Sequence, residues 1–123
     1  MRMKLELVPV PVTDVDRAKA FYVDQVGFNA DHDQRVSDDL RFVQLTPPGS
    51  ACSVVIGEGV TQMAPGSQQG LLAVIADADA ARAELAGRGV AVSEVDEQPW
   101  GRFVYFADPD GNGWALQEPP PRT

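Results

Sequence analysis

The pattern of apolar and polar positions describes two similar halves. Residues 5–12 and residues 70–76 are mostly apolar, and each run ends beside an aspartate, as strands that lead into helices do. Apolar residues then recur with helical spacing, from Val15 in the first half and from Ala78 in the second. Short apolar stretches after each helix predict three further strands per half, at about 28–36, 40–46 and 52–57, and at 90–95, 102–107 and 114–118.

Both predicted helices have residues at their ends that favour a helix start or stop. Thr13 or Asp14 in the first half, and Asp77 in the second, are residues that commonly cap a helix N-terminus. An aspartate two positions further on places negative charge in the first turn, where the helix dipole favours it. The glycines expected to end the helices are Gly27 in the first half and Gly87 or Gly89 in the second.

The two halves also align as a sequence repeat. Residues 12–20 match residues 75–83, since each segment is an apolar strand end, then Asp-x-Asp, then an Ala-rich helical stretch. Residues 45–49 match residues 107–111, because both are Pro-containing turns that end in glycine. A repeat of this length indicates a tandem duplication.

The duplication predicts an α+β fold of two βαβββ modules. We expect one domain over residues 1–123, with a first module at 5–57, a linker at 58–69 and a second module at 70–118. A chain of 123 residues is long enough to bury a core without disulfides. Cys52 is the only cysteine, so it has no partner for an internal disulfide.

The acidic composition narrows the classes of partner. The chain has 18 acidic and 10 basic residues and a formal net charge of -8, which disfavours contact with nucleic-acid phosphates and anionic lipids. No apolar stretch is long enough to span a membrane, and the N-terminus lacks the features of a targeting segment. We therefore expect a cytoplasmic protein with no nucleic-acid partner and no membrane partner.

Two motifs resemble those of a known superfamily. The stretch VPVTDVDRAKAFY at residues 10–22, closed by Val26-Gly27-Phe28, is similar to the opening helix of the vicinal oxygen chelate proteins. The stretch FADPDGN at residues 106–112 is similar to their closing turn. The resemblance, to glyoxalase, bleomycin-resistance and dioxygenase-like proteins, implies that the two modules form a curled mixed sheet around a cleft.

In that superfamily the cleft usually holds a divalent ion bound by His, Gln or Glu at equivalent strand positions. In this sequence those positions are Leu7, Ser53, Gly70 and Ala115, which together offer one hydroxyl. The only histidine, His32, lies in an acidic stretch and is expected at the surface. We therefore expect no metal and no cofactor.

Alternation along the strands predicts which side chains face the cleft. If positions 7, 70 and 115 face it, then Leu72 and Gln117 do as well. The same argument adds Phe42 with Gln44, and Phe103 with Tyr105. The candidate ligand-binding residues are Leu7, Phe42, Gln44, Leu72, Trp100, Arg102, Phe103, Tyr105 and Gln117.

Three of these candidates have structural alternatives. Trp100 is either a stacking platform at the cleft mouth or a structural plug. Arg102 either meets an anionic ligand or pairs with nearby carboxylates. Tyr105 either donates a hydrogen bond in the cleft or belongs to the core. The sequence does not identify catalytic residues.

The resemblance favours metal-independent binding, or sequestration, of a small aromatic or hydrophobic molecule. The chain is similar to bleomycin resistance proteins, and this resemblance implies a homodimer and a role in antibiotic resistance. The alternative is a metal-independent isomerase, cyclase or lyase that uses Tyr105, Arg102 or His32 as acid or base. A glyoxalase-like or dioxygenase-like metalloenzyme is the third hypothesis.

Overall fold

The computed structural model describes residues 1–121 and contains two βαβββ modules. Module one, residues 7–58, contains β1 (Leu7–Pro9), α1 (Val15–Ala20), the π-helix η1 (Phe21–Val26), β2 (Asn29–Ser37), β3 (Leu40–Thr46) and β4 (Ser53–Glu58). Module two, residues 71–118, contains β5 (Leu71–Val74), α2 (Ala78–Gly87), β6 (Asp96–Gln98), β7 (Gly101–Ala107) and β8 (Gly113–Glu118). In residues 1–121 no helix combines the length and apolar character needed to cross a bilayer.

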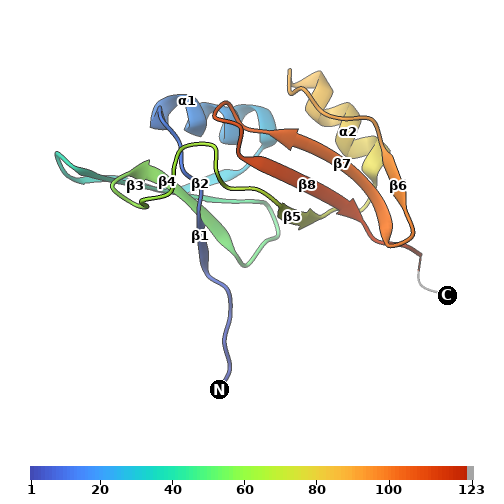
Figure 1. Cartoon of the computed structure of the whole chain (residues 1–123), viewed down its shortest axis with the longest axis horizontal. Helices are drawn as coiled ribbons and strands as arrows, with labels where there is room; N and C mark the ends of the chain where they lie inside the picture. The colour runs from blue at the N-terminus through green and yellow to red at the C-terminus, as the bar shows by residue number, and fades with distance from the viewer. Residues whose placement is uncertain (122–123) are drawn as a thin grey trace.

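The two modules have the same sheet topology. Their strand orders are β1-β4-β3-β2 and β5-β8-β7-β6, with the first pair of each sheet parallel and the others antiparallel. Figure 1 shows α1 and α2 on the same side of the sheets. The predicted fold class is thus confirmed, and within residues 1–121 the eight strands form two separate four-stranded sheets.

The helix ends follow the local sequence. The Asp14 carboxylate accepts from the backbone N–H of Arg17 at 3.0 Å, and that of Asp77 accepts from Ala80 at 3.1 Å. Gly27 ends the first helical segment with φ of +96°, a conformation in which a side chain is disfavoured. The sequence analysis did not predict that the segment's second half is a π-helix.

An aromatic cluster joins the modules. Tyr22 from η1 stacks on Phe28 and packs on Trp114 from β8, with ring centroids 5.4 and 5.9 Å apart. Trp114 in turn stacks on Phe106 of β7 at 6.0 Å. All four rings are buried, so module one contributes its helix to the core above the sheet of module two.

A hydrogen-bonded network satisfies the polar atoms inside this cluster. The Tyr22 hydroxyl donates to Oδ2 of Asp108 at 2.7 Å and accepts from the Trp114 indole N–H at 3.0 Å. Asn112 donates its side-chain N–H to the same Asp108 oxygen at 2.8 Å. Burial and the adjacent Asp108 carboxylate both raise the pKa of Tyr22, so this phenol stays protonated.

The turn that follows β7, residues 108–112, makes further bonds to module one. Oδ1 of Asp110 accepts from the backbone N–H and the hydroxyl of Thr13, at 3.2 and 2.7 Å, beside the start of α1. Asn112 donates to the carbonyl of Pro11 at 2.8 Å. The closing turn of module two is therefore a principal contact between the modules.

One predicted strand is displaced. The sequence predicts a strand at 90–95, whereas β6 begins at Asp96. The hydroxyl of Ser93 accepts from the backbone N–H of Tyr105 at 2.9 Å, and the carbonyl of Ser93 accepts from Arg82 at 3.0 Å. The backbone N–H of Ser93 still donates to the Tyr105 carbonyl at 2.9 Å, but a side chain replaces the return bond, so a regular ladder with β7 begins only at Asp96.

Candidate ligand-binding site

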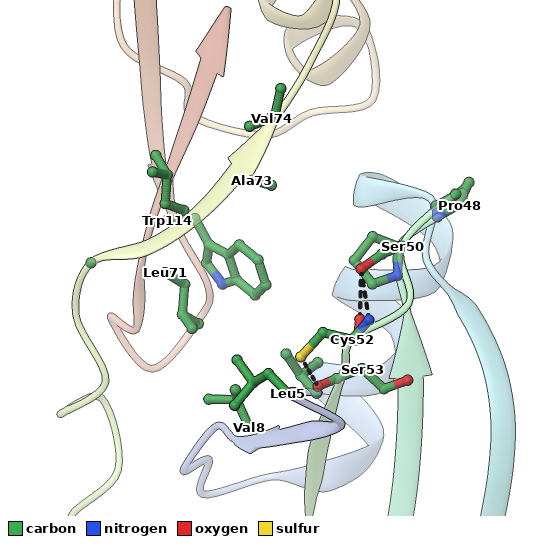
Figure 2. A pocket seen from close by; sticks show the side chains of 15 residues that line it. Leu5, Val8, Pro48, Ser50, Cys52, Ser53, Leu71, Ala73, Val74 and Trp114 are labelled. Carbon is green, nitrogen blue, oxygen red and sulfur yellow. Dashed lines mark hydrogen bonds between the residues drawn. The ribbon is translucent and has the colours of Figure 1, made fainter. Parts of the chain in front are cut away.

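A groove lies between the two modules, and we call it the inter-module groove. It has a volume of about 510 Å³ and is lined by Leu5, Val8, residues 47–50, 52–54 and 70–74, and Trp114. Figure 2 shows Leu5 and Val8 on one side, and β5 with the Trp114 ring on the other. The lining is mostly apolar, with Ser50, Cys52 and Ser53 at one end, a composition common in small-molecule sites.

A second groove, the module-two groove, has a volume of about 450 Å³. It is lined by residues 69–70, 105–107, 111 and 113–115. Gly70 and Trp114 line both grooves. Of the predicted ligand-binding residues, Tyr105 lines the module-two groove and Leu72 lines the inter-module groove.

Three of the four positions at which the superfamily carries metal ligands border these grooves. Ser53 lines the inter-module groove, Ala115 the module-two groove, and Gly70 both, whereas Leu7 lies opposite Ser53 in the β1–β4 ladder. The Ser53 hydroxyl lies 2.6 Å from that of Thr46. This donor set does not fit a divalent ion, because its one oxygen ligand is a buried hydroxyl in contact with another hydroxyl.

Residues 1–121 contain no grouping of three or more His, Cys, Asp or Glu side chains arranged to hold a metal ion.

The side of the module-two sheet that faces away from α2 is open and apolar. We call it the open face, and its residues are Leu72, Val74, Phe103, Tyr105, Ala115 and Gln117, all at least partly exposed except Phe103, which is buried. The strand register aligns Leu72 and Tyr105 with Ala115, and Val74 and Phe103 with Gln117. Leu72 is 56% exposed and Val74 is 68% exposed, because no helix covers them. Exposed apolar side chains grouped in this way commonly mark an interaction site.

An aromatic pair and a carboxylate lie together on the open face. The rings of Phe103 and Tyr105 stack with centroids 6.1 Å apart and planes 8° from parallel. The Tyr105 hydroxyl donates to Oδ2 of Asp96 at 2.7 Å, and Gln98 donates to both Asp96 oxygens at 3.0 and 3.1 Å. Asp96 lies one residue beyond the strand predicted at 90–95, so strand alternation did not place it on this face.

These hydrogen bonds move two pKa values away from neutrality. The bonds from Tyr105 and then Gln98 lower the pKa of Asp96, and the bond to Asp96 raises the pKa of Tyr105. The carboxylate therefore stays ionised and the phenol stays protonated near pH 7.

In module one the corresponding candidates form a more polar surface. Gln44 donates to the Ser53 hydroxyl at 3.2 Å, which places both on one face of the sheet. Phe42, two residues earlier in β3, is half-buried on that face. The Thr46 hydroxyl donates to Asp31 on the neighbouring strand. His32, opposite Gln44, is exposed, as expected.

The structure places Arg102 away from this surface. Its guanidinium contacts Asp79 in α2 at 3.0 Å, Glu97 at 2.9 Å and Glu118 at 3.3 Å, on the side of the sheet that α2 covers. Adjacent strand residues point to opposite faces, so Arg102 cannot share a face with Phe103. Of its two interpretations, pairing with carboxylates agrees with these contacts, and Arg102 is not part of the open face.

Trp100 and Gln117 lie at one end of the open face. Trp100, between β6 and β7, is 60% exposed, which argues against a role as a structural plug. Its carbonyl accepts from the side-chain N–H of Gln117 at 2.9 Å. The bond fixes the Gln117 amide against the β6–β7 turn.

Solved structures and a curated relative resemble this chain over nearly its whole length. TnmS3, an antibiotic binding protein from Streptomyces sp. CB03234, is 42% identical, with a TM-score of 0.88 and coverage of 97% of this chain and 98% of TnmS3. A glyoxalase/bleomycin resistance protein from the same organism is 43% identical, with a TM-score of 0.82 and coverage of 93% and 99%. YetH of Bacillus subtilis (strain 168), an uncharacterized protein, is 28% identical over 96% of this chain and all of its own length.

The family comparison agrees with these likenesses. The family model for the Glyoxalase/Bleomycin resistance protein/Dioxygenase superfamily matches residues 4–116. That range begins before β1 and ends within β8, so it includes module one, all of module two but its last two residues, and both grooves. On this match, the chain belongs to the Glyoxalase/Bleomycin resistance protein/Dioxygenase superfamily.

Proposed function

We propose that this protein binds a small aromatic or hydrophobic molecule, without a metal ion, on the open face and in the adjoining grooves. The observation that carries the proposal is the exposure of Leu72 and Val74 beside the stacked pair of Phe103 and Tyr105. An apolar ligand would remove this surface from water, which stabilises the complex in proportion to the apolar area buried.

The likeness to TnmS3 supports a ligand of antibiotic type. TnmS3 is described as an antibiotic binding protein and is 42% identical to this chain. We propose that this protein likewise acts by binding, and that a role in antibiotic resistance would come from sequestration in the cytoplasm.

The pKa shifts on the open face do not point to acid–base catalysis. The lowered pKa of Asp96 and the raised pKa of Tyr105 both move away from pH 7. Efficient general acids and bases have pKa values close to the operating pH. The proposal of a metal-independent isomerase, cyclase or lyase therefore gains no support from this pair.

We propose that a second copy of the chain completes the site. The edge strands β1 and β5 both border the inter-module groove. Edge strands present unpaired backbone N–H and C=O groups, which favour pairing with another chain. A homodimer would cover these edges and enclose the open face. Light scattering of the purified protein tests this, and a monomer at all concentrations would contradict it.

Titration with a planar aromatic probe tests the binding proposal. We expect pyrenylmethanol to quench the fluorescence of Trp100 and Trp114 and to saturate at one probe per chain. Leu72→Glu places a charge on the open face and should abolish binding. Met63→Glu is the control, because Met63 is also exposed and apolar but lines neither groove. Equal binding by both variants, or no saturable binding by the unaltered protein, would refute the proposal.

A further inference from the structure

The carboxylate of Asp96 is fixed beside the aromatic pair of the open face. Asp96 lies opposite Phe103 in the β6–β7 ladder, and its oxygens accept from Tyr105 and Gln98. The donors come from two strands, so the carboxylate orientation follows from the sheet. A ligand ring on Tyr105 would therefore have this carboxylate at its edge.

The direction of these hydrogen bonds decides what the ligand must offer. An ionised carboxylate only accepts hydrogen bonds. The proton of Tyr105 is directed at Asp96, so the phenol oxygen presents lone pairs to any other partner. Two acceptors side by side favour a ligand group that donates, such as an ammonium, a hydroxyl or an N–H.

The charge of Asp96 is not neutralised by a basic side chain, in contrast to nearby carboxylates. Glu97 in β6, Glu118 in β8 and Asp79 in α2 all contact Arg102. The partners of Asp96 within residues 1–121 are the neutral groups of Tyr105 and Gln98. Its negative charge therefore remains available to a ligand, on a chain whose net charge is -8.

We propose that Asp96, positioned by Tyr105 and Gln98, determines ligand specificity on the open face by selecting aromatic molecules that carry a hydrogen-bond donor, cations above all. The inference rests on the proposed binding function and adds the chemical class of the ligand. Anionic aromatic molecules are disfavoured by the same carboxylate.

Three probes with one ring system and different charges test the inference. They are pyrenylmethylammonium, pyrenylmethanol and pyrene carboxylate, titrated by fluorescence at neutral pH and low salt. We expect affinity to fall in that order. Asp96→Asn keeps the shape and removes the charge, and should weaken the ammonium probe about fivefold while improving the carboxylate probe.

Glu97→Gln is the matched control, because it removes the same charge one residue away on the side of the sheet that faces α2. It should leave the order and spacing of the three affinities unchanged. If all three probes bind equally, or if both variants have the same effect, the specificity role of Asp96 is refuted and the binding function stands. If no probe binds to the unaltered protein, both proposals are refuted.

Discussion

The hydroxyl of Tyr22 donates a 2.7 Å hydrogen bond to Asp108, which lies 86 residues further along the chain. The bond is buried and connects the helix of module one to the closing turn of module two. The same hydroxyl accepts from Trp114, so one oxygen atom of module one satisfies two polar groups of module two. Loss of this atom should affect the whole fold, since both of its partners are buried.

Tyr22→Phe should therefore destabilise the protein by about 1–3 kcal/mol, because it leaves a buried indole N–H without an acceptor and removes a donor to Asp108. Urea unfolding followed by circular dichroism measures the change. Tyr105→Phe is the control, since it also removes a 2.7 Å bond to an aspartate, but at an exposed position. Equal losses of stability in the two variants would show that burial does not determine the cost of removing the hydrogen bond.

Gly57→Ala should be strongly destabilising. Gly57 in β4 has φ of +157°, and an added Cβ would lie 1.9 Å from the carbonyl oxygen of Arg41 on β3. The backbone must shift, which we expect to cost about 1–3 kcal/mol or more. Gly87→Ala is the control. Gly87 is the last residue of α2 and has open space around it, and alanine has a higher helix propensity than glycine. Thermal unfolding distinguishes the two variants.

The ion pairs of Asp33 should make stability depend on acid pH. Hydrogen bonds from Arg41 and Lys19 lower the pKa of Asp33 in the folded state. Because the folded pKa of Asp33 is lowered, its ion pairs stabilise the protein fully above the unfolded-state pKa of about 3.9. This stabilisation is lost as the pH falls through the folded pKa. The stability difference between the unaltered protein and Asp33→Asn should thus shrink below about pH 4.

Urea unfolding across this pH range measures that difference. Glu84→Gln provides the comparison, because its pair with Arg88 is exposed on a helix and screened by solvent. If the difference in unfolding free energy between the unaltered protein and Asp33→Asn stays constant from neutral to acid pH, the ion pairs of Asp33 contribute nothing to stability.

Arg102→Gln should lower stability and leave ligand affinity unchanged. Arg102 joins the start of α2 to the sheet through Asp79, Glu97 and Glu118, on the side opposite the open face. Unfolding experiments and probe titration on the same variant separate the two effects. A selective loss of affinity for pyrene carboxylate would restore Arg102 as a ligand-binding residue.

Local signals in the sequence predicted the parts of the fold that depend on local contacts. The capping roles of Asp14 and Asp77 could be predicted because each acts on a backbone N–H three residues away. The face shared by Phe103 and Tyr105 follows from strand alternation alone. The same rule places Arg102 on the opposite side of the sheet from them.

Other features depend on contacts between distant residues. Asp108 could be predicted as a turn residue, but its bond to Tyr22 depends on how the modules pack. Asp96 was missed because the Ser93 hydroxyl accepts from the backbone N–H of Tyr105, so the regular strand begins later in the chain than the apolar pattern predicts. A pattern of apolar and polar positions does not contain this competition.

The two aligned turns, residues 45–49 and 107–111, now differ in what they contact. The second includes Asp108 and Asp110, which bond to Tyr22 and Thr13 of the other module. The first turn contributes residues 47–49 to the lining of the inter-module groove. One copy of the turn is therefore a joint between the halves, whereas the other borders the groove in which we propose that a ligand binds.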